Sequence, residues 1–128
     1  MSTIREALTT YLKAHTGLAA LVGAKVYPET IPQGQTPPLV TVGSLNPVEL
    51  QVAELVQTRV DCHCWATTAL VADAIAVQVR KALYAYHGTM SGLHVHGKVL
   101  TRRSMYVPQA QLYRTTLEAQ FLYREPTS

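Results

Sequence analysis

Residues 18–42 of this chain read LAALVGAKVYPETIPQGQTPPLVTV, and this stretch decides how the fold is interpreted. Glycine commonly closes a helix, so a short apolar helical turn is expected to end at Gly23. A clipped strand over residues 25–27 then stops at Pro28, and a proline-rich loop leads through Pro37 and Pro38 into a second strand. This order indicates a long exposed loop that is available for contacts, as in assembly subunits. It contains no arrangement typical of a catalytic pocket.

The composition favours one globular domain over residues 1–128. Hydrophobic residues make up 48% of the chain and charged residues only 15%, against roughly 25% in typical domains. A surface so poor in charge is often partly buried against partners. The net charge of +3 is mild, which argues against nucleic-acid binding as the main task, since such proteins usually concentrate basic charge on one face.

The sequence also bears on the compartment. No apolar stretch reaches the roughly 18 residues that span a bilayer, and the first residues lack the apolar segment of a secretory leader and include Glu6. We therefore expect synthesis in a cytoplasm and no membrane contact. Cys62 and Cys64 are expected to be free thiols, because side chains at i and i+2 of a strand run parallel and form a poor disulfide.

Hydrophobic periodicity predicts an α+β domain with the element order α-β-β-β-α-β-β. A first helix is expected to run to about His15 and stop near Gly17, and a second from about Thr68 to before Gly88. After the clipped strand come strands over 39–45, with a continuation to about Ala53, and over 55–65, 92–103 and 112–123. Strands arranged in hairpins with two helices predict a mostly antiparallel sheet with both helices packed on one face.

The strand over residues 55–65 has the clearest alternation in the chain. Its even-numbered residues are expected to face the core: Val56, Thr58, Val60, Cys62 and Cys64. Its odd-numbered residues are expected to face solvent or a partner: Gln57, Arg59, Asp61, His63 and Trp65.

Short sequences near the ends of the predicted elements, taken in order, resemble those of a family of tailed-phage tail-completion or tail-terminator proteins. The matching pieces are LAALVG at residues 18–23, VYP at 26–28, PLV at 38–40, VDC at 60–62, WA at 65–66, YVP at 106–108 and LYR at 112–114. The resemblance implies a ring, usually a hexamer, at the head-proximal end of the tail tube, which stops tube polymerisation and offers a docking face for head-completion proteins. It implies no enzymatic activity.

The resemblance also implies which partners the chain has. The expected partners are other copies of this chain, the tail-tube protein and a head-completion or connector protein, and the subunit is expected to be monomeric before assembly. DNA is expected to pass through the ring without sequence-specific binding. The chain is expected in the virion tail, and in the host cytoplasm during assembly. A head-tail connector, or stopper, subunit is the alternative within the same class.

The candidate interface residues lie in two extended segments and one turn. Four prolines limit the freedom of the loop over residues 28–38, so ordering it on a partner costs less. The stretch 46–57 alternates apolar and polar residues and is a candidate arm that adds to a neighbour's sheet. The candidate contacts with a neighbouring subunit or the tube are Tyr27, Pro28, Ile31, Pro32, Gln33, Pro37, Val48, Leu50, Val52 and Tyr106. A basic face lining the lumen is predicted from Arg59, Arg102 and Arg103.

Two chemical alternatives compete with an assembly role. Cys62-x-Cys64 and His94-x-His96 each place two metal-ligand side chains on one face of a strand, so neighbouring strands would give a Cys2His2 zinc site. The usual Cys-x2-Cys spacing is absent, and buried thiols are the commoner reading. A thiol enzyme would need a histidine beside a cysteine, but His63 points to the opposite face from both. No catalytic residue, metal or cofactor is therefore expected.

Overall fold

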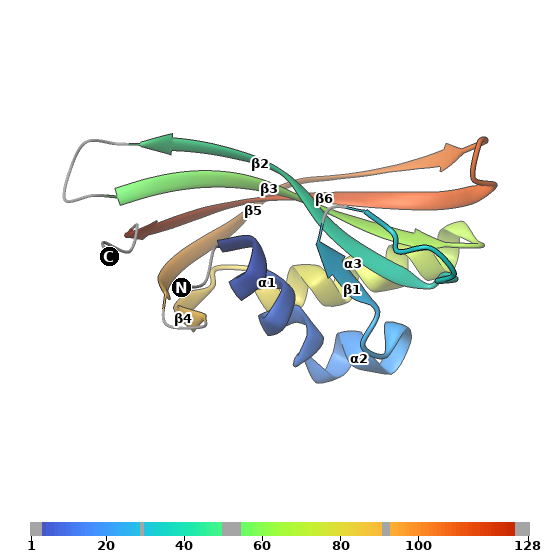
Figure 1. Cartoon of the computed structure of the whole chain (residues 1–128), viewed down its shortest axis with the longest axis horizontal. Helices are drawn as coiled ribbons and strands as arrows, with labels where there is room; N and C mark the ends of the chain where they lie inside the picture. The colour runs from blue at the N-terminus through green and yellow to red at the C-terminus, as the bar shows by residue number, and fades with distance from the viewer. Residues whose placement is uncertain (1–3, 29, 50–54, 91–92, 125–128) are drawn as a thin grey trace.

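A six-stranded sheet carries the helices on one of its faces in the computed structural model of the chain, which describes residues 4–28, 30–49, 55–90 and 93–124 (Figure 1). The described elements in chain order are α1 (Ile4–Lys13), α2 (Thr16–Val22), β1 (Val26–Pro28), β2 (Leu39–Glu49), β3 (Leu55–Ala66), α3 (Ala69–Leu83), β4 (His87–Met90), β5 (Leu93–Val107) and β6 (Leu112–Arg124). The α+β class predicted from the sequence is confirmed.

The strands lie in the order β1-β2-β3-β6-β5-β4. Four of the neighbouring pairs are antiparallel, and β1 pairs with β2 in parallel, with Val26 opposite Val40. Parallel neighbours need a crossover connection, because the chain must return to the same end of the sheet before the second strand begins. The long proline-rich loop is this crossover, so its length has a topological cause.

The helices begin and end at residues with clear capping roles. His15 caps α2, because its Nδ1 accepts a hydrogen bond from the Leu18 backbone N–H at 3.2 Å. Gly23 closes α2 with a φ of 64°, a conformation that glycine adopts without steric cost. Thr68 caps α3, and its hydroxyl accepts from the Val71 N–H at 3.3 Å.

The core lies between the helices and the sheet face that they cover. The alternation predicted for β3 is confirmed, since Val56, Thr58, Val60, Cys62 and Cys64 are all buried. The same holds for one face of β6, where Thr115, Leu117, Ala119, Phe121 and Tyr123 are buried. The helices contribute apolar stripes to this core, among them Leu8 and Leu12 of α1, Leu18 of α2, and Ile75, Val79 and Leu83 of α3.

The two-helix description is wrong, because residues 16–22 form a separate helix rather than a single turn. The sequence interpretation took Gly17 as a stop signal, but Gly17 lies inside α2, where a Cβ would run into the Gln78 side chain of α3. The glycine therefore marks a close approach of two helices. The expectation of a mostly antiparallel sheet omitted the parallel pairing of β1 with β2.

A second difference concerns the segment after α3. The helix stops at Leu83, before Gly88 as expected, and Ala85 adopts a φ of 51° in the turn that follows. The chain then forms β4, which the sequence interpretation missed, and β4 pairs with the start of β5. β5 also runs to Val107, four residues beyond the predicted end.

The opposite face of the sheet, here called the open face, is not covered by any described helix (Figure 1). Among its residues are Arg59, His63 and Trp65 of β3 and Arg114, Glu118 and Gln120 of β6. Within the described ranges, no helix combines the length and apolar character needed to cross a bilayer.

Candidate assembly surfaces

Two side chains, Lys25 just before β1 and Tyr27 within β1, hold the proline-rich loop against this strand. The Lys25 ammonium donates to the Thr36 carbonyl at 2.9 Å, and the Tyr27 hydroxyl donates to Gln35 Oε1 at 2.8 Å. Gly34 has a φ of 87°, and a turn closes where the Gln35 N–H donates to the Pro32 carbonyl at 3.2 Å. The second half of the loop is therefore anchored before any partner binds.

The predicted contact residues of this loop lie together beside the β1 edge of the sheet. Pro28, Pro32 and Gln33 are exposed, whereas Tyr27, Ile31 and Pro37 are partly buried. Tyr27 serves an internal role as well, because its hydroxyl helps to anchor the loop.

The candidate arm over residues 46–57 is only partly described. Val48 lies in β2 opposite Gln57 of β3, so this part of the arm pairs within its own sheet. Leu50 and Val52 lie outside the described residues.

The hairpin of β5 and β6 carries exposed apolar and aromatic side chains on both of its faces near its end. The chain turns between Val107 and Leu112, and in Figure 1 this end projects to the right beyond β1 and β2. Met105 is 49% exposed, Tyr106 46% and Tyr113 36%, and the two tyrosine rings lie 5.0 Å apart. Tyr106 was predicted as a contact residue, whereas Tyr113 was missed because it shares the periodicity of the core residues in its strand.

A second exposed apolar row runs along the outer side of α3. Leu70 is 84% exposed, Val77 37% and Tyr84 60%, and these residues recur at intervals of seven. Seven residues are close to two helical turns, so the three side chains follow one line along the helix. Arg80 lies with its guanidinium carbon 4.5 Å from the Tyr84 ring centroid. We call Leu70, Val77 and Tyr84 the α3 stripe.

The three arginines predicted as one basic face lie on two faces. Arg59 and Arg103 are exposed on the open face. The pairing of β5 with β6 shifts register between Val99 and Thr101, so Arg102 lies opposite the buried Leu117, on the side that carries the helices. There Arg102 and Arg80 line a shallow hollow of about 270 Å³ beside Tyr84.

The cysteines and histidines of the metal alternative do not come together. Cys62 and Cys64 are fully buried under the helices, and burial raises the pKa of Cys62 to about 12 and that of Cys64 well above its ordinary value. Both thiols are therefore protonated and poor nucleophiles. His94 and His96 are exposed on β5, and β6 lies between β5 and β3. The Cys2His2 site considered as an alternative is thus not formed by these four residues.

His63 also stays apart from the cysteines, as its place in the alternation predicted. Its Nδ1 lies 2.8 Å from the Thr116 hydroxyl on the open face, and its ring packs near Trp65. Burial, and then the nearby Arg114 charge, lower the pKa of His63. The Trp65 indole N–H donates to the Thr41 hydroxyl at 3.1 Å, which fixes the ring against β2.

With these surfaces placed, the comparisons with known proteins decide the family. The family model described as Tail completion protein gp17 matches residues 6–124. The chain belongs to this family. The resemblance to tail-completion proteins is therefore confirmed, and membership makes the chain a structural protein of phage-type particles.

The solved structures support the fold of this tail-completion protein. A chain of the "Virion of native gene transfer agent (GTA) particle" matches with a TM-score of 0.75 and 22% identity, over 95% of each chain. At this identity the likeness shows a shared fold. No curated protein matches the chain.

Proposed function

We propose that this tail-completion protein forms a homo-oligomeric ring, a hexamer as the family resemblance implies, at the head-proximal end of the tail tube. The ring ends tube growth and offers a docking face to a head-completion or connector protein. The observation that carries the proposal is the family match across residues 6–124. This range includes all the described helices and strands except the first two residues of α1. The same match favours tail completion over a separate connector role.

A ring requires two different, complementary surfaces on each subunit. The α3 stripe and the exposed end of the β5–β6 hairpin belong to different elements, and each presents large apolar side chains to solvent. Exposed apolar groups of this kind commonly mark protein contacts. We pair the α3 stripe of one subunit with the hairpin end of the next, through Tyr106 and Tyr113.

The proline-rich loop is proposed to contact the tail tube or the next subunit. Its exposed residues, Pro28, Pro32 and Gln33, lie in a segment that is already anchored through Lys25 and Tyr27. A pre-ordered loop loses little conformational entropy when it binds. The arm around Val48 is proposed as a further contact with a neighbouring sheet.

The open face is proposed to line the lumen. Arg59 and Arg103 supply basic charge, and Asp61 and Glu118 lie on the same face. Contacts from arginine to phosphate groups carry no sequence information, which suits passage of DNA without sequence-specific binding. Arg102 is left out of this surface because it lies on the side of the helices.

The proposed role involves no catalysis, in keeping with the two buried, protonated thiols. The protein is proposed to be monomeric when dilute, to assemble in the host cytoplasm and to remain in the virion tail. A dilution series followed by light scattering tests self-association. The expected result is a rise in mass toward a closed ring with concentration or on addition of tube protein, whereas a constant monomer mass under both conditions would contradict the proposal.

The loop role has its own test. Because the loop is also the crossover between β1 and β2, its anchors Lys25 and Tyr27 should be kept and its exposed part changed. The double substitution Pro32→Asp and Gln33→Glu, at two exposed positions, is expected to weaken assembly while circular dichroism stays unchanged. Normal assembly by a folded double variant would refute the contact role.

A further inference from the structure

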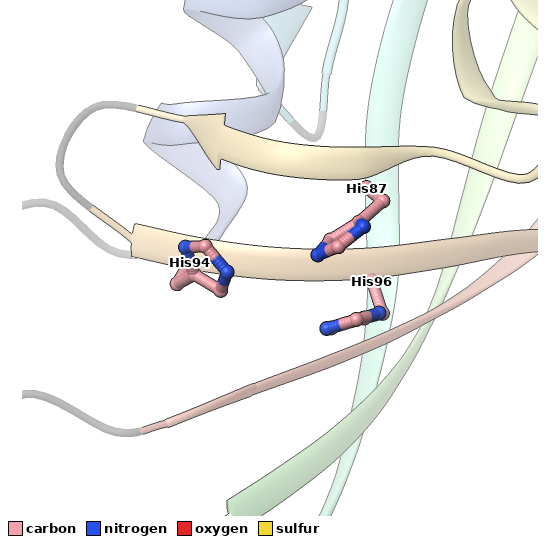
Figure 2. Close-up of side chains that lie close together, drawn as sticks. All are labelled: His87, His94 and His96. Atoms are coloured by element: carbon pink, nitrogen blue, oxygen red, sulfur yellow. The ribbon is translucent and has the colours of Figure 1, made fainter.

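Three exposed histidines gather on the hairpin of β4 and β5 (Figure 2). His94 and His96 are two residues apart on β5, so their side chains share one face of the strand. His87 of β4 lies directly opposite His96 in the antiparallel register. Val95, between the two β5 histidines, is fully buried on the other face. The backbone pairing therefore places all three imidazoles on the same side of the hairpin.

The three rings are close to one another. The centroids of His87 and His96 lie 4.2 Å apart, those of His87 and His94 5.6 Å, and those of His94 and His96 6.1 Å. Each histidine can offer one ring nitrogen such that the three nitrogens all lie within 4.8 Å of one another. This arrangement does not involve the buried cysteines, and the sequence interpretation missed His87 because it lay within the supposed end of α3.

We propose that His87, His94 and His96 form a binding site for a divalent transition metal, with Zn²⁺ as the preferred ion. Neutral imidazole is a good ligand for zinc and nickel, and three histidines with one open position make a complete protein ligand set for zinc. Zn–N bonds of about 2.0–2.1 Å place tetrahedral ligand nitrogens roughly 3.4 Å apart. The present separations of up to 4.8 Å are larger, so the proposed site requires these exposed side chains to rotate toward the ion.

The site lies on two paired strands, which limits the cost of assembling the ligands. His87 and His96 are fixed as a cross-strand pair, and the neighbouring Gly97 N–H donates to the Tyr86 carbonyl at 2.8 Å. Only side-chain rotation is needed on binding. Because the imidazoles are exposed, the open coordination position is accessible to water.

The test is isothermal titration of the untagged full-length chain with Zn²⁺ and, separately, with Ni²⁺ near neutral pH. The expected result is one ion per chain, with affinity reduced at least tenfold by each of H87A, H94A and H96A. His15→Asn is the matched control, because it removes an imidazole elsewhere and keeps an acceptor at the α2 N-cap. Affinity is also expected to fall at pH 5.5, because protons compete with the metal for the ring nitrogens.

Imidazole NMR gives a second readout that does not depend on the variants. Zn²⁺ is expected to shift the ring resonances of three histidines and to leave those of His63 and His15 unchanged. Absence of binding at one ion per chain would overturn the proposal, and so would equal affinity in a folded triple-alanine variant. Zinc shifts confined to other residues would overturn it as well.

Discussion

The substitution Leu70→Asp separates folding from assembly most sharply. Leu70 follows Ala69 and the Thr68 cap, so it lies in the first turn of α3, a turn that contains no acidic residue. Its side chain is 84% exposed, so little packing is lost. A carboxylate near a helix N-terminus is favourable by roughly 0.3–1 kcal/mol. The free energy of unfolding of the isolated chain is therefore expected to stay the same or rise slightly.

The effect on assembly has the opposite sign. Burying a leucine side chain stabilises a contact by about 1.5–3 kcal/mol, and the exposure of Leu70 leaves nearly all of this available to a partner. A loss of about 2 kcal/mol per subunit contact weakens association roughly 30-fold. Light scattering over a dilution series, alongside chemical denaturation, measures both quantities on the same preparations.

Ala69→Asp is the matched control, because it adds the same charge in the same helical turn but off the α3 stripe. Association by this variant is expected to stay near that of the unaltered chain. Equal association by Leu70→Asp and Ala69→Asp would refute the proposed role of the α3 stripe. Loss of folding in Leu70→Asp would refute the reasoning about its exposure.

Three further predictions concern stability. Gly97→Ala is expected to cost about 1–3 kcal/mol in thermal or chemical denaturation, because a Cβ there would lie 2.8 Å from Cε1 of the fully buried Phe121 ring; unchanged stability would contradict this packing. Thr68→Ala is expected to cost about 1 kcal/mol by denaturation, since the Val71 N–H loses its acceptor, whereas Thr68→Ser should be nearly neutral. The pKa of His63 is lowered in the folded state, so at low pH the unfolded chain binds a proton on this side chain more readily than the folded chain does. The folded protein is therefore expected to keep its full stability above about pH 6.5 and to lose stability as the pH falls below it. His63→Gln should reduce that loss in denaturation curves at pH 5 and 7, and an identical pH dependence in both proteins would rule it out.

The parts of the fold that the sequence predicted are those with strong local patterns. The alternation in β3 identified its buried face, including Cys62 and Cys64, because a period of two leaves only one way to bury the apolar set. The connection expected between the last two strands is also present, and the Ala110 N–H closes this turn by donating to the Val107 carbonyl.

The parts that were missed depend on contacts distant in sequence. β4 is a four-residue strand, HGTM, with little strand propensity, and pairing with β5 defines it. Gly17 resembles a helix stop, but its role is to let α2 approach Gln78 of α3. The register shift after Val99 has no signal in the sequence, and it determines the face of the sheet on which Arg102 and Arg103 each lie.

The candidate surfaces show the same difference between features with a local sequence pattern and features that depend on distant contacts. The proline-rich loop could be predicted because its composition is unusual, yet its crossover role depends on the parallel pairing of β1 with β2. The seven-residue spacing of Leu70, Val77 and Tyr84 was visible in the sequence. A buried helix face and an exposed stripe have the same periodicity, so only the packing of α3 distinguishes them.

The most direct test of tail completion is tube growth in the presence of this chain. The tail-tube protein from the same genome is polymerised with and without the purified chain, and tube lengths and ends are examined by electron microscopy. The account predicts shorter tubes with a ring of extra density at one end, and longer tubes when Leu70→Asp replaces the unaltered chain. Tubes of unchanged length with bare ends at saturating protein would contradict it.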